Sequence, residues 1–275
     1  MKATELYLVA GTARTGSNVL CHALAAAGLP RAEEAFSRAT IQESGLRLSD
    51  GGGKADIVRY LDWFMSRSQD TRCGMKIFWH QVSGYGLEAA LEDLLAGRLG
   101  PEKVKMVFLR RRDTALQAVS TLRAYATGAF AARSDRDEAR YVYDDAYWAA
   151  PGVLAAARER MAAGDLYDFD DLDCIERQIA ESNAAWLHFF QRTGTPYRTY
   201  YYEDLAADVA GTADVAGTAD VAGTADAVLQ WFGYDAVMPS GYQPLLLVQR
   251  DEDSYRMAAR FRAEQQQKGQ HDGRS

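Results

Sequence analysis

The chain has 275 residues, of which 48% are hydrophobic and 25% are charged, and its formal net charge at pH 7 is −7. These values are typical of a globular protein, and they exclude a disordered tail, a collagen-like chain and a protein that coats nucleic acid or an anionic membrane. The chain has no run of about 18 apolar residues, and its N-terminus lacks the apolar stretch of a secretory signal, so we expect a cytoplasmic protein without a membrane span.

Short apolar runs alternate with amphipathic segments along the chain. Strands are predicted at residues 6–10, 74–79, 104–109 and 196–202. Helices are predicted at residues 17–27, 56–66, 87–99, 113–125 and 171–191, with one or two more within 137–163. This alternation predicts an α/β fold of three layers, with a central parallel sheet of four to five strands and helices on both faces. No linker rich in Pro, Gly or Ser divides the chain, so we predict a single domain over residues 1–275.

A hexapeptide repeat interrupts this pattern. Ala-Asp-Val-Ala-Gly-Thr occurs in tandem from Ala207, Ala213 and Ala219, and a further copy begins at Ala225. So few copies, without large apolar residues, cannot build a β-helix, and expansion of one unit by replication slippage explains them better. We predict an exposed insertion at about 207–226 with no catalytic role.

The cysteines and histidines do not indicate a metal site. Cys21, Cys73 and Cys174 are few and widely spaced, which is not the pattern of a disulfide framework or a zinc site. We predict buried free thiols, scattered histidines that are packed or on the surface, and no bound metal.

The predicted strand at 6–10 leads into Gly-Thr-Ala-Arg-Thr-Gly-Ser-Asn and then into a helix. The backbone N–H groups of such a glycine-bearing turn can converge on an anion, and the helix N-terminus adds its positive end. A nucleotide triphosphatase would have Lys and Ser or Thr where this chain has Ser17 and Asn18, so magnesium-dependent hydrolysis is disfavoured. Arg14 can supply a charge-assisted donor, which predicts an anion site without a metal. A turn that binds no ligand is the alternative.

A second candidate anion site follows the predicted strand at 104–109. Three arginines, at positions 110–112, lie at its carboxyl end, where open α/β sheets bind their ligands. The next helix brings Gln117, Ser120 and Arg123 near one another by helical spacing. Two such clamps would suit a ligand with two separated anionic groups, although a run of arginines is also typical of a solvated surface.

These motifs resemble those of sulfotransferases. Residues 14–18 resemble the loop that binds the 5′-phosphosulfate, and residues 111–124 resemble the 3′-phosphate motif. Further resemblance lies at residues 74–79, 202–205, 249–254 and 260–261. The combination covers nearly the whole chain and is similar to the bacterial trehalose 2-sulfotransferase-like family of carbohydrate sulfotransferases, within the P-loop sulfotransferase superfamily.

The resemblance implies a function and a set of ligand contacts. The donor would be 3′-phosphoadenosine-5′-phosphosulfate, and the acceptor a hydroxyl of a carbohydrate or another small molecule. The 3′-phosphate would bind Arg111 and Ser120, with Arg123 in the same motif. The 5′-phosphosulfate would bind Arg14, Thr15, Gly16, Ser17 and Asn18. The resemblance also implies a homodimer, and nothing in it points to a nucleic-acid partner.

In the resembled family a glutamate that shortly precedes an aromatic residue is the general base. Counting back from Phe36, Glu34 is the best match, but the segment is one residue shorter here, so Glu33 stays open. Arg14 and Lys76 are candidates for stabilising the leaving group. Lys76 lies at the end of a predicted buried strand and needs an anionic partner, either the donor or a protein carboxylate.

Two other functions compete with sulfuryl transfer. A non-catalytic nucleotide-binding or regulatory protein could have kept the phosphate loop and lost the base. A metal-dependent small-molecule kinase would need a loop lysine and a magnesium ligand, and this loop has neither.

Overall fold

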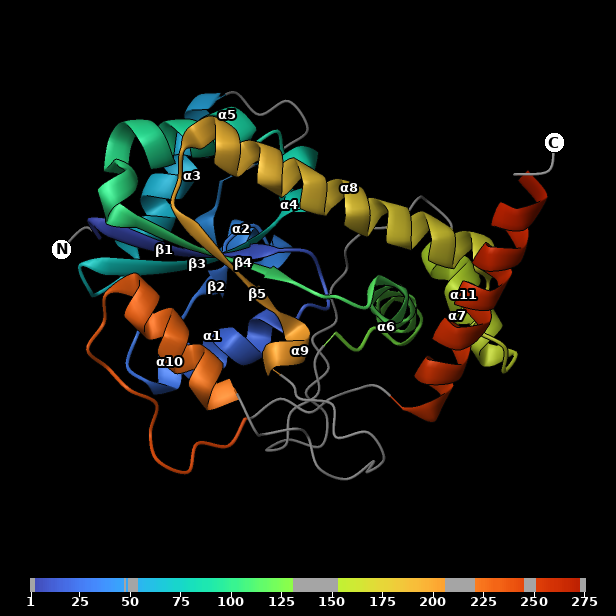
Figure 1. The fold of residues 1–275 in the computed structure, drawn as a ribbon. Helices are drawn as coiled ribbons and strands as arrows, with labels where there is room; N and C mark the ends of the chain where they lie inside the picture. The colour runs from blue at the N-terminus through green and yellow to red at the C-terminus, as the bar shows by residue number, and fades with distance from the viewer. Residues whose placement is uncertain are drawn as a thin grey trace. The chain divides into compact units, whose positions relative to one another are not determined.

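A computed structural model describes residues 3–46, 48, 54–130, 153–205, 221–244 and 251–272 (Figure 1). These residues form two compact units. The sheet unit contains the described residues up to 110 together with 182–205 and 221–244, and the helical unit contains those of 111–181 and 251–272. Within the described residues, the chain passes from the sheet unit to the helical unit after residue 110, at the end of a strand, and returns after residue 181, within a helix.

The sheet unit contains five parallel strands, and this confirms the predicted α/β fold. Their order is β2-β3-β1-β4-β5. The strands are β1 (Glu5–Gly11), β2 (Glu33–Glu34), β3 (Arg72–Phe78), β4 (Val104–Arg110) and β5 (Tyr197–Tyr201). Strand β2 is the one that the sequence did not locate, because two residues are too few to show an alternating pattern.

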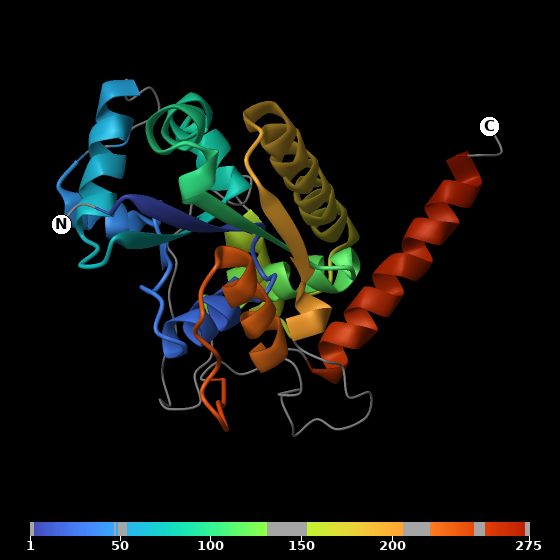
Figure 2. The ribbon, with the colours of Figure 1, turned by 60° about the vertical axis from the view of Figure 1, so that its left-hand side comes forward.

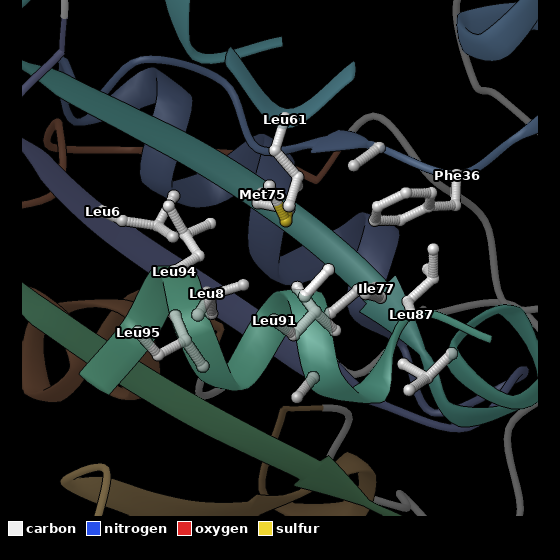
Figure 3. Packing of buried hydrophobic residues seen from close by; sticks show 14 of the residues in the cluster. Leu6, Leu8, Phe36, Leu61, Met75, Ile77, Leu87, Leu91, Leu94 and Leu95 are labelled. Atoms are coloured by element: carbon white, nitrogen blue, oxygen red, sulfur yellow. The ribbon is translucent and has the colours of Figure 1, made fainter. Parts of the chain in front are cut away.

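The sheet is buried on both faces because successive strand residues point to opposite sides. In β1, Leu6 and Leu8 belong to one apolar core, whereas Tyr7 and Val9 belong to the other. Figure 3 shows the first core, in which leucines of the sheet and of the 87–99 segment pack together. Each Å² of apolar surface removed from water stabilises the folded state by about 25 cal/mol, so these two cores are the main source of the unit's stability.

Helices cover each face of this sheet and complete the three predicted layers (Figure 2). On the first face lie α3 (Lys54–Ser66), α5 (Glu88–Glu92) and the C-terminal turns of α8 (Phe169–Thr193). On the second face lie α1 (Ser17–Ala26) and α10 (Val221–Phe232). The predicted helix at 87–99 begins as α5 and continues as the π-helix η1 (Asp93–Leu99).

Four short elements that were not predicted complete the sheet unit. They are too short for a periodic pattern to reveal them. They are α2 (Arg38–Ser44), α4 (Trp79–Gly84), the 3₁₀ turn η2 (Pro101–Lys103) and α9 (Tyr202–Leu205).

The repeat is not an exposed insertion as far as residue 226. Its residues 207–220 lie outside the described part of the chain, but residues 221–226 form the first turns of α10. Val221 and Ala225 are buried in the second core, and the Thr224 hydroxyl donates to the Asp204 carbonyl at 3.2 Å. The last full copy is therefore structural, because helical periodicity places its valine, together with the alanine that follows the copy, on the buried face of α10.

The helical unit is built from α6 (Thr114–Thr127), α7 (Val153–Ala162), the first turns of α8, and α11 (Glu252–Asp272). Asp113 caps α6, since its carboxylate accepts from the Leu116 N–H at 2.8 Å. Of the helices predicted within 137–163, α7 is present, and residues 137–152 lie outside the described chain. Across the described segments, no helix combines the length and the apolar character needed to cross a bilayer.

Candidate functional site

The glycine-bearing loop after β1 is a tight turn at the carboxyl edge of the sheet. Gly11, the last residue of β1, lies opposite Leu109 of β4, and a Cβ atom on Gly11 would come within 2.5 Å of the Leu109 carbonyl oxygen. The buried Thr15 hydroxyl donates to the Thr12 carbonyl at 2.9 Å and closes the turn. Arg14 adopts a left-handed conformation with φ of 64°, which is unusual for a residue with a side chain.

The loop leads directly into the N-terminus of α1, and this junction has features that suit an anion. Gly16, at φ of 76°, is the N-cap of α1 and has no side chain to accept from the first-turn N–H groups. Those groups have no partner within their own helix and carry its positive end. A Cβ atom on Gly16 would lie 2.8 Å from the Tyr202 ring, so only glycine fits this close approach. The residues present therefore fit a phosphate or sulfate group.

Lys76 lies beside this loop. The sequence left open whether its anionic partner is the donor or a protein carboxylate. Lys76 belongs to β3, in which alternate residues point to the α1 face of the sheet. Its ammonium group contacts Glu34 Oε2 at 2.8 Å and donates to Asn18 Oδ1 at 2.6 Å. The Lys76 and Glu34 side chains are only 5% and 8% exposed. The buried ammonium thus has a protein carboxylate as its partner, as a buried charge requires.

Gln81 holds the other oxygen of the same carboxylate. Its Nε2 donates to Glu34 Oε1 at 2.8 Å, and its Oε1 accepts from the Phe78 N–H at 3.0 Å. We did not predict a role for Gln81. The only signal in the sequence is its place in the first turn of a helix that directly follows a strand, where glutamine often accepts from the N-cap N–H.

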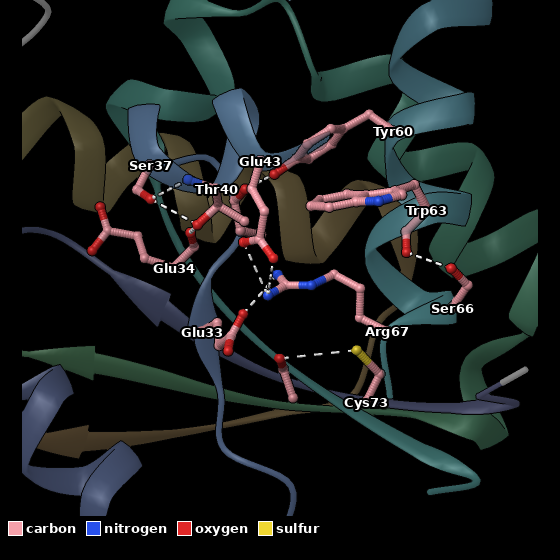
Figure 4. A network of polar contacts seen from close by, with 12 residues as sticks. Glu33, Glu34, Ser37, Thr40, Glu43, Tyr60, Trp63, Ser66, Arg67 and Cys73 are labelled. Atoms are coloured by element: carbon pink, nitrogen blue, oxygen red, sulfur yellow. Dashed lines mark hydrogen bonds and ion pairs between the residues drawn. The ribbon is translucent and has the colours of Figure 1, made fainter. Parts of the chain in front are cut away.

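The two adjacent glutamates point into different surroundings (Figure 4). Glu33 accepts from Arg67 Nη1 at 2.8 Å, and its side chain is 46% exposed. Arg67 also contacts Glu43 and lies over the Trp63 ring. Glu33 therefore belongs to a partly solvated ion-pair cluster, whereas Glu34 lies in a buried network that reaches the phosphate loop.

Arg110 is the last residue of β4, and the other residues of the second predicted anion site lie in the helical unit. Arg111 is buried directly after β4, and Gln117, Ser120 and Arg123 lie on α6, as the helical spacing predicted. The Arg123 guanidinium makes a bidentate ion pair with Asp251, with Nη–O distances of 2.9 and 2.7 Å. A phosphate at Arg123 would thus have to share the guanidinium with a carboxylate.

Several other predicted residues have packing roles. Trp79 meets Trp186 edge-to-face at a ring distance of 5.0 Å, which is typical of core packing. The Trp186 indole donates to the Gly11 carbonyl at 2.9 Å and fixes the start of the loop, a contact that the sequence did not indicate. Cys21 and Cys73 are buried free thiols as predicted, and burial raises their pKa values to about 11 and about 12. Cys174 is also a free thiol, but it is only partly buried, so the prediction was wrong on that point. Within the described ranges, no group of three or more His, Cys, Asp or Glu side chains is arranged to hold a metal ion.

Comparison with known proteins identifies the family of this chain. No curated protein gives a match to the chain. A family model described as Stf0 sulphotransferase matches residues 6–264, from the second residue of β1 to within α11. The match includes the phosphate loop, Glu34, Lys76 and the arginine motif after β4. The chain therefore belongs to the Stf0 sulphotransferase family, and it is an enzyme with sulfotransferase activity.

Proposed function

We propose that the protein transfers a sulfuryl group from 3′-phosphoadenosine-5′-phosphosulfate to a hydroxyl of a carbohydrate or another small molecule. The observation that carries this proposal is the buried network Asn18–Lys76–Glu34, with contacts of 2.6 and 2.8 Å. It joins a carboxylate that can accept a proton to a loop whose backbone suits a phosphosulfate. Family membership supports the reaction type.

The chain's own residues would divide the binding of the donor. The first-turn N–H groups of α1, the Arg14 guanidinium and the side chains of Thr15, Ser17 and Asn18 would hold the 5′-phosphosulfate. Arg111 and Ser120 would hold the 3′-phosphate, with Arg123 as a secondary contact. When bound, the donor supplies the sulfuryl group: its sulfur forms a bond to the acceptor oxygen as the bond to the bridging phosphate oxygen breaks.

Glu34 would accept the proton of the attacking hydroxyl, and its burial and contact with Lys76 support it over Glu33. A positioned base contributes about 10²–10⁴-fold to rate. Lys76 has three N–H donors, of which Asn18 and Glu34 engage two, and the third would stabilise negative charge on the leaving oxygen together with Arg14. The carbohydrate acceptor and the homodimer are proposed from the family resemblance, and the cytoplasmic location is proposed from the sequence.

Calorimetric titration with 3′,5′-adenosine bisphosphate, in the absence of magnesium, tests this proposal. We expect micromolar binding that weakens by about tenfold or more, ~1.4 kcal/mol, in Arg14→Ala and in Arg111→Ala. Arg59→Ala, which removes an exposed arginine of α3 far from the loop in sequence, is the matched control and should bind as the unaltered protein does. An affinity that is the same in both variants as in the unaltered protein would overturn the donor assignment. Binding without turnover on any hydroxyl acceptor would favour the non-catalytic alternative.

A further inference from the structure

We propose that Gln81 is a positioning residue that orients the Glu34 carboxylate for proton acceptance. The inference rests on the proposed function, which assigns proton acceptance to Glu34. It concerns a residue that neither the sequence motifs nor the family match assigns. Gln81 lies on α4, next to the end of β3, and its side chain is buried at 4% exposure.

The hydrogen bonds of Gln81 fix which way its amide faces. The Phe78 backbone N–H can only donate, so the amide oxygen must face it, at 3.0 Å. The amide N–H group must then face Glu34 Oε1, at 2.8 Å. A backbone group at the end of a sheet strand thus sets the direction in which Gln81 donates.

The Glu34 carboxylate is consequently held at both oxygens by donors on two different elements. Gln81 on α4 engages Oε1, and Lys76 on β3 engages Oε2. The backbone reinforces this arrangement, because Glu34 and Lys76 are register partners and the Ala35 N–H donates to the Lys76 carbonyl at 3.1 Å. A donor at each oxygen fixes the orientation of the carboxylate plane. Such fixed orientation is what general-base catalysis requires.

Other charged and titratable groups in this region come from separate elements. Lys76, Arg31 and Glu34 all act on the pKa of Cys21, a thiol on α1 whose pKa burial raises to about 11. Arg31 precedes β2 and also contacts His22 of α1 at 3.4 Å. The Gln81 amide donates to Glu34 without carrying a charge. A substitution at position 81 that adds a carboxylate therefore introduces a like charge beside Glu34 Oε1.

Gln81→Glu separates a positioning role from a merely structural one. A glutamate keeps an acceptor for the Phe78 N–H and is well suited to the first turn of a helix, so the α4 cap is retained. It loses the N–H donor to Glu34 and places two carboxylates about 3 Å apart, which favours a shared proton. Gln81→Met loses both the cap and the donor. Gln42→Glu, on the exposed face of α2, is the matched control for the added charge.

Steady-state kinetics with the phosphosulfate donor, using trehalose as the acceptor probe, give the first readout. We expect the acid limb of kcat/KM against pH to move up by about one unit or more in Gln81→Glu. At pH 7, kcat should fall by about tenfold or more in both Gln81 variants, with KM for the donor within about twofold. If α4 capping were the whole role, Gln81→Glu would behave like the unaltered protein and only Gln81→Met would be impaired, which would overturn the proposal.

A second readout does not depend on activity. The Glu34 carboxyl carbon, assigned by its loss in Glu34→Gln, is followed by ¹³C nuclear magnetic resonance against pH in the full chain without ligands. We expect its titration midpoint to rise in Gln81→Glu and to be unchanged in Gln42→Glu. The same midpoint in Gln81→Glu as in the unaltered protein would overturn the contact. A shifted midpoint in a protein without turnover would count against the proposed function and leave the positioning by Gln81 standing.

Discussion

At the scale of single residues, the pair Glu33 and Glu34 shows how strand geometry assigns chemistry. Both are glutamates, adjacent in the chain, and both precede Phe36. Because they occupy neighbouring positions of β2, they point to opposite sides. One meets Arg67 at a partly solvated surface, and the other meets Lys76 and Gln81 in the interior.

This difference predicts opposite outcomes for two otherwise equal substitutions. Glu34→Gln should lower kcat by about 10²–10⁴-fold, because the base is lost while the shape is kept. Glu33→Gln should leave kcat within about threefold, since an exposed ion pair contributes ~0–1 kcal/mol to stability and nothing to proton transfer. Turnover of both variants is measured beside their binding of 3′,5′-adenosine bisphosphate, which should be retained and so report a folded loop. A larger loss in Glu33→Gln than in Glu34→Gln would reverse the assignment.

At the scale of elements, one aspartate joins two helices of the helical unit. Asp251 precedes α11 and accepts from the Ser254 N–H at 2.9 Å, so it caps that helix. The same carboxylate pairs with Arg123 of α6. Burial alone would raise the pKa of Asp251, but the hydrogen bonds from Ser254 and Arg123 outweigh it and lower the pKa below its ordinary value.

A lowered pKa in the folded state makes this contact a source of stability that depends on pH. The stability is fully present above the ordinary aspartate pKa of about 3.9 and is lost as the pH falls through the lower folded-state pKa. Asp251→Ala, which removes both the cap and the ion pair, should therefore destabilise the protein by about 1 kcal/mol at pH 7, and the difference should shrink below about pH 4. Denaturant unfolding at several pH values measures this. Asp173→Asn, which breaks an exposed ion pair within α8, is the control, and an equal effect there would contradict the capping argument.

At the scale of the whole molecule, the repeat and the two units set the organisation of the chain. The family match spans residues 6–264 and thus includes both units and the repeat. The copies of the repeat are identical in sequence, so deletion of any two leaves the same chain. What remains is one copy that can start α10 with its buried valine.

Removal of two copies, residues 207–218, should therefore change the free energy of unfolding by less than about 1 kcal/mol, since loop-closure entropy varies slowly with loop length. Removal of all three copies also deletes Val221 and Thr224, with the Thr224–Asp204 hydrogen bond, and should cost about 2 kcal/mol or more. Thermal unfolding of the two deletion variants distinguishes these outcomes. Equal stability of both variants would show that the last copy has no structural role.

The sequence by itself determined the elements whose pattern is local. The strands at 6–10, 74–79 and 104–109, the helices at 17–27 and 113–125, and the glycine-bearing loop follow from apolar periodicity, capping residues and glycine positions, all of which act between close neighbours in the chain. The absence of a disulfide or zinc spacing also predicted that Cys21 and Cys73 are free thiols. These local rules were sufficient for the α/β class and for the position of a glycine-bearing loop, without the triphosphatase lysine, between a strand and a helix.

Only the tertiary structure decided which side chains meet. The contacts of Lys76 with Asn18, of Gln81 with Glu34 and of Trp186 with Gly11 join residues separated by 58, 47 and 175 positions. Local preferences carry no information on such pairs, because they arise from the order of strands in the sheet and from the register of the two-residue strand β2. The physical reason is that a strand this short has no pattern of its own, yet its pairing with β3 fixes which of two glutamates is buried beside Lys76.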